Sequence, residues 1–481
     1  MPAHPLYRYE ELARFITSLV QNGALRRGSR VPSLRAISAQ TKASLSTALQ
    51  AYRLLEDRGV IEARPQSGFY VANGRKVSLE PPGMSKPPAR AISVNMSGVL
   101  MRLLEHAADL RLVPLGCAIP STELLAAGKL DRCLARAARI KGTSYNTYTA
   151  PRGDEQLRLE IARRALRSGQ ALSPEDVAIT CGCTEAVTLA LKAVSRPGDA
   201  IAVESPTYFG FLQVIEALGL KAFELPTDSA MGVDLAALEK ALSGNAIKAC
   251  LFSSSFGNPL GCTMPEDRKV ATLDLLAKHA VPLIEDDIYG DIHFGKERPK
   301  PFQALRPQAD VIYCSSFSKT VAPGYRIGWI ATARHMPRVL ESKFAFTLAG
   351  PALPQAAMAE FLSSGGYDNH LRRLRRCFAD AVEQSIRTIE KAFPKGTRVT
   401  RPEGGFVLWL ELPKPFNGRE LFQQALERGI CFAPGDVFSA NRRYANCLRI
   451  SCGHGFDAQI EMGLETLGEM ASLALSSGAF P

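Results

Sequence analysis

The sequence contains no uninterrupted apolar run of the ~18 residues that a membrane-spanning helix needs. Its first residues, Met1 to Glu11, lack the basic patch followed by an apolar core that marks a secretory signal. It has 11 cysteines, an odd number, with no Cys-x-x-Cys pair, and Cys181 with Cys183 supplies too few ligands for a zinc site. These absences argue against a membrane protein, a secreted disulfide scaffold and a zinc protein. We therefore expect reduced thiols, no bound metal and a cytoplasmic location.

Positive charge, by contrast, is abundant and unevenly spread. The 481 residues carry a net charge of +11, and residues 1–75 hold 11 Lys or Arg against 5 Asp or Glu. More than half of the excess positive charge therefore lies in less than a sixth of the chain. Because a concentrated positive field attracts a polyphosphate backbone, we expect the amino-terminal segment to bind nucleic acid.

The pattern of residues 9–71 predicts three helices followed by a two-stranded wing. Apolar residues recur at helical spacing over 9–22 and 44–55, and Pro32 and Ser33 start a second helix between these segments. Residues 60–64 and 69–71 are predicted to form two strands joined by a turn. This order is typical of a winged helix-turn-helix, whose third helix enters the major groove of DNA.

Short motifs in this segment resemble the GntR-type DNA-binding domain, namely Pro32-Ser33-Leu34-Arg35, Ala51-Tyr52, Leu55 to Ile61, Ser67-Gly68 and Val71. The resemblance implies DNA contacts from Arg35, Ser46, Thr47, Arg64 and Gly68. Many GntR-type recognition helices, however, have an arginine where this chain has Leu45. We therefore expect base readout to depend on Ser46, Thr47, Gln50 and Arg53. A small helical module that binds protein instead of DNA is the alternative.

The next segment is rich in proline. Residues 76–95 contain Pro81-Pro82 and Pro87-Pro88 with Ser, Gly and Lys between them, a composition that favours extended polyproline conformations. We predict a DNA-binding domain at 1–75, a linker at 76–104 and an effector domain at 105–481.

From about residue 105 onward, short apolar runs alternate with longer helical stretches. The runs include residues 177–180, 200–203, 249–252, 282–284, 311–314 and 327–330. Each run is typical of a buried parallel strand, so the pattern predicts an α/β sheet wrapped by helices. In such sheets the ligand binds beyond the carboxyl ends of the strands, and the residues that follow each run are candidate site residues.

Lys319, in the run Ser315 to Trp329, carries the most information. A lysine amine can form a Schiff base with an aldehyde, while nearby hydroxyls and Arg326 can hold a phosphate group. The aldehyde phosphate that fits this description is pyridoxal 5′-phosphate (PLP). Other strand ends supply matching groups: a glycine turn into a helix at Gly182, an aromatic ring at Tyr208, an amide at Asn258 and a carboxylate at Asp286. Lys319 alone is compatible with an exposed loop lysine, but the five signals together favour one cofactor site.

These residues resemble the fold-type I family of PLP-dependent enzymes, the aspartate aminotransferase group, over about residues 105–475. The resemblance implies a mixed, mostly parallel sheet, a homodimer and a set of residue roles. At the phosphate it implies the backbone amides of Cys183 and Thr184, the side chains of Ser316, Ser318 and Arg326, and Tyr148 from the neighbouring subunit. At the ring it implies stacking by Tyr208, contacts of Asn258 and Tyr289 with the 3′-oxygen, Asp286 at the pyridine nitrogen and Lys319 as the Schiff-base lysine. Arg449 is implied to bind a carboxylate of the substrate or effector.

A winged helix-turn-helix joined to an aminotransferase-like domain resembles the MocR-type regulators of the GntR superfamily over the whole chain. The resemblance implies a dimeric transcription factor that binds double-stranded DNA and senses PLP, an amino compound that forms an aldimine in place of Lys319, or both. One alternative is a working PLP-dependent aminotransferase with an appended DNA-binding domain. Another is a regulator that has lost the cofactor, which the intact Lys319, Asp286 and Tyr208 argue against.

Overall fold

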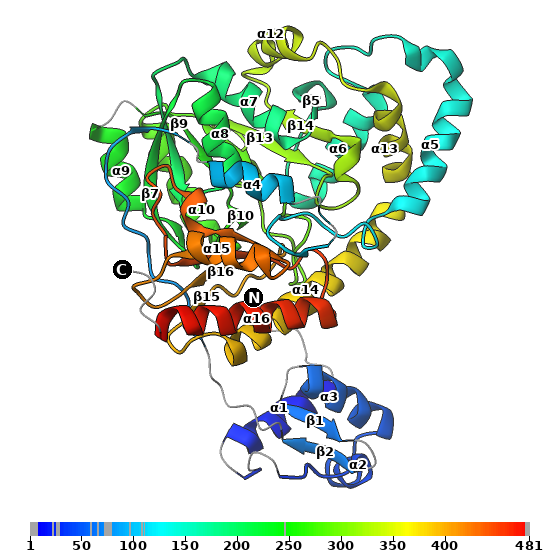
Figure 1. Cartoon of the computed structure of the whole chain (residues 1–481). Helices are drawn as coiled ribbons and strands as arrows, with labels where there is room; N and C mark the ends of the chain where they lie inside the picture. Colours follow the sequence, from blue (N-terminus) through cyan, green and yellow to red (C-terminus); the bar gives the residue numbers. More distant parts are fainter. Residues whose placement is uncertain are drawn as a thin grey trace. The chain divides into compact units, whose positions relative to one another are not determined.

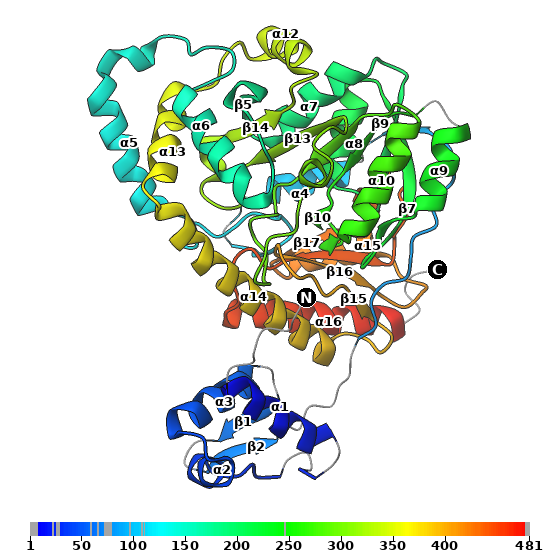
Figure 2. The same cartoon turned by 180° about the vertical axis from the view of Figure 1, so that it is seen from behind.

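The computed structural model describes residues 8–21, 24, 25, 29–57, 60–64, 67–71, 79–95, 98–106, 109, 111–244 and 247–476. The chain divides into two compact units, Met1–Ser78 and Leu79–Pro481. Figure 1 shows both units and Figure 2 gives the reverse view. None of the helices in the described ranges has both the length and the apolar character needed to cross a membrane.

The described residues of the small unit form three helices and a β-hairpin, as predicted. Its elements are α1 (Arg8–Gln21), α2 (Leu34–Thr41), α3 (Leu45–Asp57), β1 (Ile61–Arg64) and β2 (Gly68–Val71). The Ser33 hydroxyl caps α2 by accepting a hydrogen bond from the Ala36 N–H at 3.2 Å. The Ser44 hydroxyl accepts one from the Thr47 N–H at 3.1 Å at the start of α3. Caps of this kind contribute roughly 1 kcal/mol each to helix stability.

One apolar core joins the helices to the hairpin. Its buried members are Leu12, Ala13, Ile16, Val31, Ile37, Ala48, Ala51, Tyr52, Leu55, Ile61 and Val71. The Tyr52 hydroxyl donates to the Pro32 carbonyl oxygen at 2.6 Å and so ties α3 to the residue before the α2 cap. The strands pair antiparallel with Ile61 opposite Val71. On α3, Ser46, Gln50 and Arg53 are exposed, as the helical pattern predicted, and Thr47 is half-buried. The same pattern placed Leu45 and Leu49 on the inward stripe with Ala48, Tyr52 and Leu55, and this was wrong, because both leucines are exposed.

A nine-stranded, mostly parallel sheet forms the centre of the large unit. Its main path runs β3 (Ile92–Ser93), β7 (Lys221–Asp228), β6 (Ala200–Ser205), β9 (Ile247–Phe252), β12 (Leu283–Asp286), β13 (Val311–Ser316), β14 (Ile327–Ala331) and β5 (Val177–Cys181), and β8 (Gly232–Val233) pairs with β7. Strands β7, β6, β9, β12 and β13 run parallel to one another. Strands β3 and β14 pair antiparallel with their neighbours, so the sheet is mixed.

Helices cover both faces of this sheet (Figures 1 and 2). On one face lie α7 (Cys183–Val194), α8 (Phe209–Ala217) and α12 (Met336–Phe346), and on the other α9 (Leu235–Gly244) and α10 (Glu266–Lys278). Alternate strand residues point to opposite faces: Ile201 and Val203 belong to the core under α7 and α8, whereas Ala202 belongs to the core under α9 and α10. Burial on both faces explains why these strands are continuous apolar runs in the sequence.

A second sheet of five strands completes the large unit. Its order is β15 (Arg398–Val399), β16 (Val407–Glu411), β18 (Cys447–Ser451), β17 (Ile430–Pro434) and β4 (Val113–Leu115), and β10 (Ser255–Gly257) pairs separately with β11 (Cys262–Thr263). The remaining helices are α4 (Gly98–His106), α5 (Ala127–Lys141), α6 (Glu155–Ala165), α11 (Phe302–Leu305), α13 (Ala352–Ser363), α14 (Gly366–Ala392), α15 (Gly418–Glu427) and α16 (Ala458–Ser476). Helix α14 is long and lies beside α16 in both views (Figures 1 and 2).

Part of the segment predicted as a linker packs on the large unit. Ser85 exchanges hydrogen bonds with Thr227, from the Thr227 N–H to Ser85 Oγ at 2.9 Å and from the Ser85 N–H to the Thr227 carbonyl at 3.3 Å. Strand β3 then adds to the free edge of β7. An extended, proline-rich chain can do this because an edge strand needs partners on one side only. The segment from Leu79 onward therefore belongs to the larger compact unit, and the domain boundaries at 75 and 105 stay predictions.

Candidate functional site

A cavity of about 260 Å³ lies where the carboxyl ends of several strands of the nine-stranded sheet meet. It is lined by all of the large-domain residues predicted for the site except Tyr148: Cys183, Thr184, Tyr208, Asn258, Asp286, Tyr289, Ser316, Ser318, Lys319, Arg326 and Arg449. These residues are spread over more than half of the chain. The topology brings them together because parallel strands end at the same edge of the sheet.

Lys319 follows β13 and points into this cavity. Its Nζ donates a hydrogen bond to the Ala118 carbonyl oxygen at 2.7 Å. Burial, and then the positive charge of Arg449, lower the pKa of Lys319 to about 8. A lysine with a pKa near 8 is partly neutral at pH 7, and the neutral amine is the form that attacks a carbonyl carbon.

Asp286 ends β12, and both of its carboxylate oxygens accept hydrogen bonds. The Cys183 thiol donates to Oδ1 at 3.0 Å, and the Ser253 hydroxyl donates to Oδ2 at 3.1 Å. Burial raises the pKa of Asp286 to about 6, against the effect of these two donors. Ser253 was not among the predicted residues, although its position directly after β9 is the kind of strand-end signal that identified the others. The predicted role of Cys183 was its backbone amide, and the contact of its thiol with Asp286 was missed.

The aromatic and amide groups predicted around a flat ring also line the cavity. The Tyr208 ring packs against Phe209 and Phe211, with ring centroids 4.7 and 5.4 Å apart. Gly210 makes room for it, since a Cβ there would lie 2.4 Å from the ring. The Asn258 Oδ1 atom is buried and has no hydrogen-bond partner among the described residues. An unpaired buried acceptor is costly, so this atom is suited to a ligand hydroxyl.

At the other end of the cavity, α7 begins at Cys183 without a side-chain cap. The φ of Gly182 is +84°, and a Cβ at this position would lie 2.3 Å from Arg326 Nη2, so glycine allows the guanidinium to approach the start of the helix. Arg326 Nη2 donates to the Cys181 carbonyl oxygen at 2.9 Å. Free backbone amides at a helix start, together with a guanidinium and the hydroxyls of Ser316 and Ser318, form a site for a phosphate group.

Arg449 lies on β18 of the second sheet and is completely buried. Its Nη2 donates to the Gly116 carbonyl oxygen at 2.5 Å, whereas Nε and Nη1 have no partner among the described residues. Burial lowers its pKa. Because a buried guanidinium without an anionic partner is unfavourable, the two free N–H groups indicate a place for an anionic ligand group.

Tyr148 does not line the cavity. Its side chain is 84% exposed. It follows the 3₁₀ turn Gly142–Asn146, and the neighbouring Thr149 hydroxyl donates to the Gly350 carbonyl oxygen at 3.3 Å. Such exposure is compatible with a contact to another subunit, and the role implied for Tyr148 stays a prediction.

The predicted DNA contacts lie on α2, α3 and the hairpin of the small unit. Arg35, Ser46, Gln50 and Arg53 are exposed and Thr47 is half-buried. Gly68 has a φ of +100°, which places the wing turn in a conformation that favours glycine. The side chain of Arg64 lies outside the described residues. Leu45 and Leu49 on α3 are also exposed, by 54% and 37%.

Two family models match the chain. The model for aminotransferase class I and II matches residues 122–467, and the model for bacterial regulatory proteins of the GntR family matches residues 8–71. The first of these matches lies within the large unit, and the second lies within the small unit.

Relatives of two kinds are similar to the chain. The uncharacterized HTH-type transcriptional regulators YjiR and YdcR of Escherichia coli (strain K12) are each 36% identical to it, over 97% and 96% of this chain and 99% and 98% of their own. The 2-aminoadipate transaminase of Thermus thermophilus is 31% identical over 73% of this chain and 87% of its own. The crystal structure of LysN, an α-aminoadipate aminotransferase from Thermus thermophilus complexed with N-(5′-phosphopyridoxyl)-L-leucine, is 29% identical, with a TM-score of 0.74 and coverage of 79% of this chain and 96% of its own.

Proposed function

Because this chain belongs to the MocR-type regulators, in which a GntR-family helix-turn-helix domain is joined to an aminotransferase class I and II domain, we propose that its large unit is a sensor. In this proposal it binds PLP at Lys319 and responds to PLP itself, to a primary amine that reacts with the cofactor, or to both. The small unit binds DNA, as its GntR family implies, and reports the response.

The residues of the cavity fit PLP. The start of α7 with Arg326 is a phosphate site, the unpaired Oδ1 of Asn258 is an acceptor for the ring hydroxyl, and the Tyr208 ring offers a stacking surface. Asp286, held by Cys183 and Ser253, supplies a carboxylate for the pyridine nitrogen. Proteins of this aminotransferase class are PLP-dependent, so the match of the family model supports the same cofactor.

When bound, PLP supplies an aldehyde that condenses with primary amines and a ring that withdraws electrons. Lys319 is the amine that the cavity provides, and its lowered pKa leaves part of it neutral and reactive near pH 8. The ionised Asp286 carboxylate would favour a protonated pyridine nitrogen, because a negative charge beside the ring nitrogen stabilises its protonated form. An amine from outside competes with Lys319 for the same aldehyde, which makes the site responsive to amino compounds.

The proposal of an amino-acid effector depends on Arg449. Arg449 lines the cavity that also holds the Lys319 amine, and its Nε and Nη1 have no partner among the described residues. A molecule with a carboxylate and an amine can satisfy Arg449 while it replaces Lys319. The sensing of an amino acid therefore needs no residue beyond those lining the cavity. We also propose a homodimer in which Tyr148 of one chain reaches the phosphate held by its partner.

The experiment that tests the proposal begins with the purified full-length chain and PLP. Borohydride reduction followed by peptide mass spectrometry should find the cofactor on Lys319, and Lys319→Ala should remove both this label and the visible absorbance of bound PLP. A panel of amino acids and amines is then titrated, and DNA binding is measured with each compound that changes the spectrum. Absence of any label on Lys319 at saturating PLP would contradict the proposal.

A working aminotransferase with an appended DNA-binding domain is the second candidate. It is favoured by the complete set of Lys319, Asp286 and Arg449 in one cavity and by the similarity to transaminases. Sustained conversion of an amino acid and a keto acid at ordinary enzyme rates of about 1 s⁻¹ or more would favour it over the sensor. A single half-reaction without turnover would favour the sensor.

A further inference from the structure

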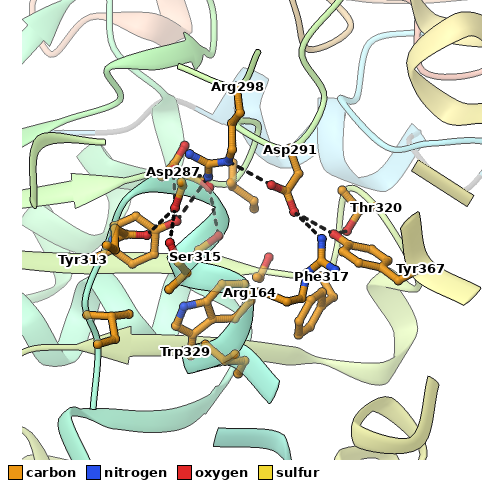
Figure 3. Close-up of a pocket in the computed structure, with 17 residues that line it drawn as sticks. Arg164, Asp287, Asp291, Arg298, Tyr313, Ser315, Phe317, Thr320, Trp329 and Tyr367 are labelled. Carbon is orange, nitrogen blue, oxygen red and sulfur yellow. Dashed lines mark hydrogen bonds and ion pairs between the residues drawn. The ribbon is translucent and has the colours of Figure 1, made fainter. Parts of the chain in front are cut away.

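A second, smaller cavity of about 40 Å³ adjoins the Lys319 loop (Figure 3). It shares Ser316 and Ile288 with the cofactor cavity, but its other lining residues are different. Its lining residues include four charged side chains: Arg164, Asp287, Asp291 and Arg298. No role proposed above uses these side chains.

Hydrogen bonds and ion pairs join these side chains into a continuous chain, which we name the Arg298 bridge. Arg298 Nη2 donates to Asp287 Oδ2 at 2.5 Å and Arg298 Nε donates to Asp291 Oδ1 at 2.9 Å. The Tyr367 hydroxyl then pairs with Asp291 Oδ2 at 3.1 Å and with Thr320 Oγ1 at 2.9 Å. Figure 3 shows Arg298 between the two carboxylates and Tyr367 between Asp291 and Thr320. The bridge thus consists of Asp287, Arg298, Asp291, Tyr367 and Thr320.

Both ends of the bridge are next to the proposed cofactor anchors in the sequence. Asp287 follows Asp286, and Thr320 follows Lys319. Because neighbouring residues share a peptide unit, a displacement of either end moves the adjacent anchor. The bridge therefore links the residues next to Lys319 and Asp286, and none of its own members lines the cavity that holds these two side chains.

The bridge is also firmly attached to its surroundings. The Asp287 side chain is 0% exposed and that of Arg298 13%. Although burial alone would raise it, Arg298 and then Arg164 hold the pKa of Asp291 at about 2, so this carboxylate stays ionised. The Arg164 guanidinium lies 4.1 Å from the Tyr367 ring centroid and adds a cation–π contact. Two further contacts come from α14: His370 Nε2 with the Thr320 carbonyl oxygen at 2.6 Å, and Arg375 Nε to the Asp291 carbonyl oxygen at 2.7 Å.

We propose that the Arg298 bridge positions Lys319 relative to Asp286 and couples this spacing to α14. Helix α14 is suited to such a coupling because its later residues, among them Leu374 and Phe378, belong to the core of the second sheet. Arg298, Asp291 and Tyr367 are positioning residues, since none of them lines the cofactor cavity. The inference rests on the proposed function, because it takes Lys319 and Asp286 to be the anchors of PLP.

Tyr367→Phe tests this inference, since it removes the hydroxyl that joins Asp291 to Thr320 and keeps the ring. We expect the Kd for PLP to rise about tenfold, in line with the loss of buried hydrogen bonds. At saturating PLP the fraction of cofactor that borohydride fixes to Lys319 should fall, and the pH midpoint of the visible absorbance should shift. Asp291→Asn, which removes the charge with little change of size, should have the same effects and serves as the second variant if Tyr367→Phe does not fold.

Tyr444→Phe is the matched control. It removes a hydroxyl that pairs with Ser205 Oγ at 2.7 Å in the same unit, outside the bridge. Wild-type protein that takes up no PLP would overturn the proposed function itself. Wild-type protein that binds PLP, with Tyr367→Phe and Asp291→Asn matching it in midpoint and labelling, would overturn the positioning role alone. Equal changes in Tyr444→Phe would do the same, because the effect would then belong to any lost buried hydroxyl.

A different surface carries a second inference, which rests on the DNA-binding function of the small unit. Leu45 and Leu49 are exposed and four residues apart on α3, so they lie on the same side of the helix. In winged helix-turn-helix proteins the third helix enters the major groove. The apolar feature of that groove is the C5 methyl group of thymine. The geometry points to Leu45 and Leu49 as readers of thymine methyl groups.

Uracil substitution isolates this contact, because uracil lacks only the methyl group. The full-length chain is used to select a duplex from random-sequence DNA, and each thymine of the selected site is then replaced by uracil. At one or two positions the replacement should weaken binding of the wild type about fourfold per methyl and leave Leu45→Ala or Leu49→Ala unaffected. Phe15→Ala, which removes an exposed apolar side chain on α1, should respond to uracil as the wild type does. Equal weakening of the wild type and both leucine variants, or no weakening at all, would overturn the inference.

Discussion

Replacement of Arg449 by methionine should affect ligand recognition and folding in opposite directions. Arg449 is fully buried, and its Nε and Nη1 have no partner among the described residues. A bound carboxylate that accepts two charge-assisted hydrogen bonds from this guanidinium gains ~1.5–3 kcal/mol from each. Even at the lower limit their loss costs ~3 kcal/mol, which is about a 100-fold loss of affinity. The free protein, in contrast, should keep or gain stability, because an apolar side chain replaces an uncompensated buried charge.

The assay compares pairs of ligands that differ only in the carboxylate, such as alanine and ethylamine. Each is titrated into the PLP-loaded protein while the visible absorbance is followed. Wild-type protein should prefer alanine by about 100-fold, and Arg449→Met should not distinguish the two amines. Arg298→Met is the contrasting variant for stability, because it leaves the fully buried carboxylate of Asp287 without its cation and should lower the Tm. If Arg449→Met keeps the preference for alanine, or loses stability as Arg298→Met does, the reasoning is refuted.

Three further predictions concern other parts of the chain. The folded-state pKa of Lys319 is lowered to about 8, so the fraction of neutral amine increases as the pH rises through 8. The rate of PLP loading should therefore rise about tenfold from pH 7 to 9 and level off above pH 9. A rate that does not change with pH, measured by stopped-flow absorbance, would contradict this prediction. Asp286→Asn removes the charge of the carboxylate and keeps a side chain of similar size, so it should raise the Kd for PLP by ~10-fold or more in a fluorescence titration. A Kd equal to that of the wild type would argue against a contact of Asp286 with the ring nitrogen. Arg35→Ala should weaken binding to the DNA upstream of the protein's own gene and reduce the slope of log K against log salt by about 1, and an unchanged slope in a fluorescence anisotropy assay would remove Arg35 from the phosphate contacts.

The cavity residues were predictable from the sequence because many of them occupy the same place relative to a strand, directly after its apolar run. Cys183, Asn258, Asp286 and Lys319 each follow an apolar run, and parallel strands end at one edge of the sheet. The small unit was predictable for a similar reason, since its caps at Ser33 and Ser44 and its apolar stripes are local signals.

Other features depend on contacts that no local pattern reveals. The Cys183 thiol meets Asp286 across 103 positions of the chain, and the Lys319 amine donates to the carbonyl of Ala118 across 201. Arg298 and Asp291 lie in a segment without strand or helix, and Tyr367 comes from α14, so the bridge forms only when the sheet and α14 pack together. The pairing of β3 with β7 was not predictable from the proline-rich segment, because composition describes backbone conformation and not whether a free sheet edge is available to pair with it.

The position of Arg449 explains how an aminotransferase-like cavity can serve a regulator. Lys319 and Asp286 belong to the nine-stranded sheet, whereas Arg449 lies on β18 of the five-stranded sheet. An amino acid bound as proposed would contact both sheets at once, whereas PLP has no carboxylate to offer Arg449. A ligand shifts the equilibrium between two conformations of a protein only by the difference between its binding free energies for them. Since the Arg449 contact amounts to ~3 kcal/mol or more, it is large enough to change the affinity for DNA by about 100-fold, the upper part of the usual range for allosteric coupling. Loss of this single contact should therefore uncouple DNA binding from amino acids while leaving PLP binding and DNA binding each intact.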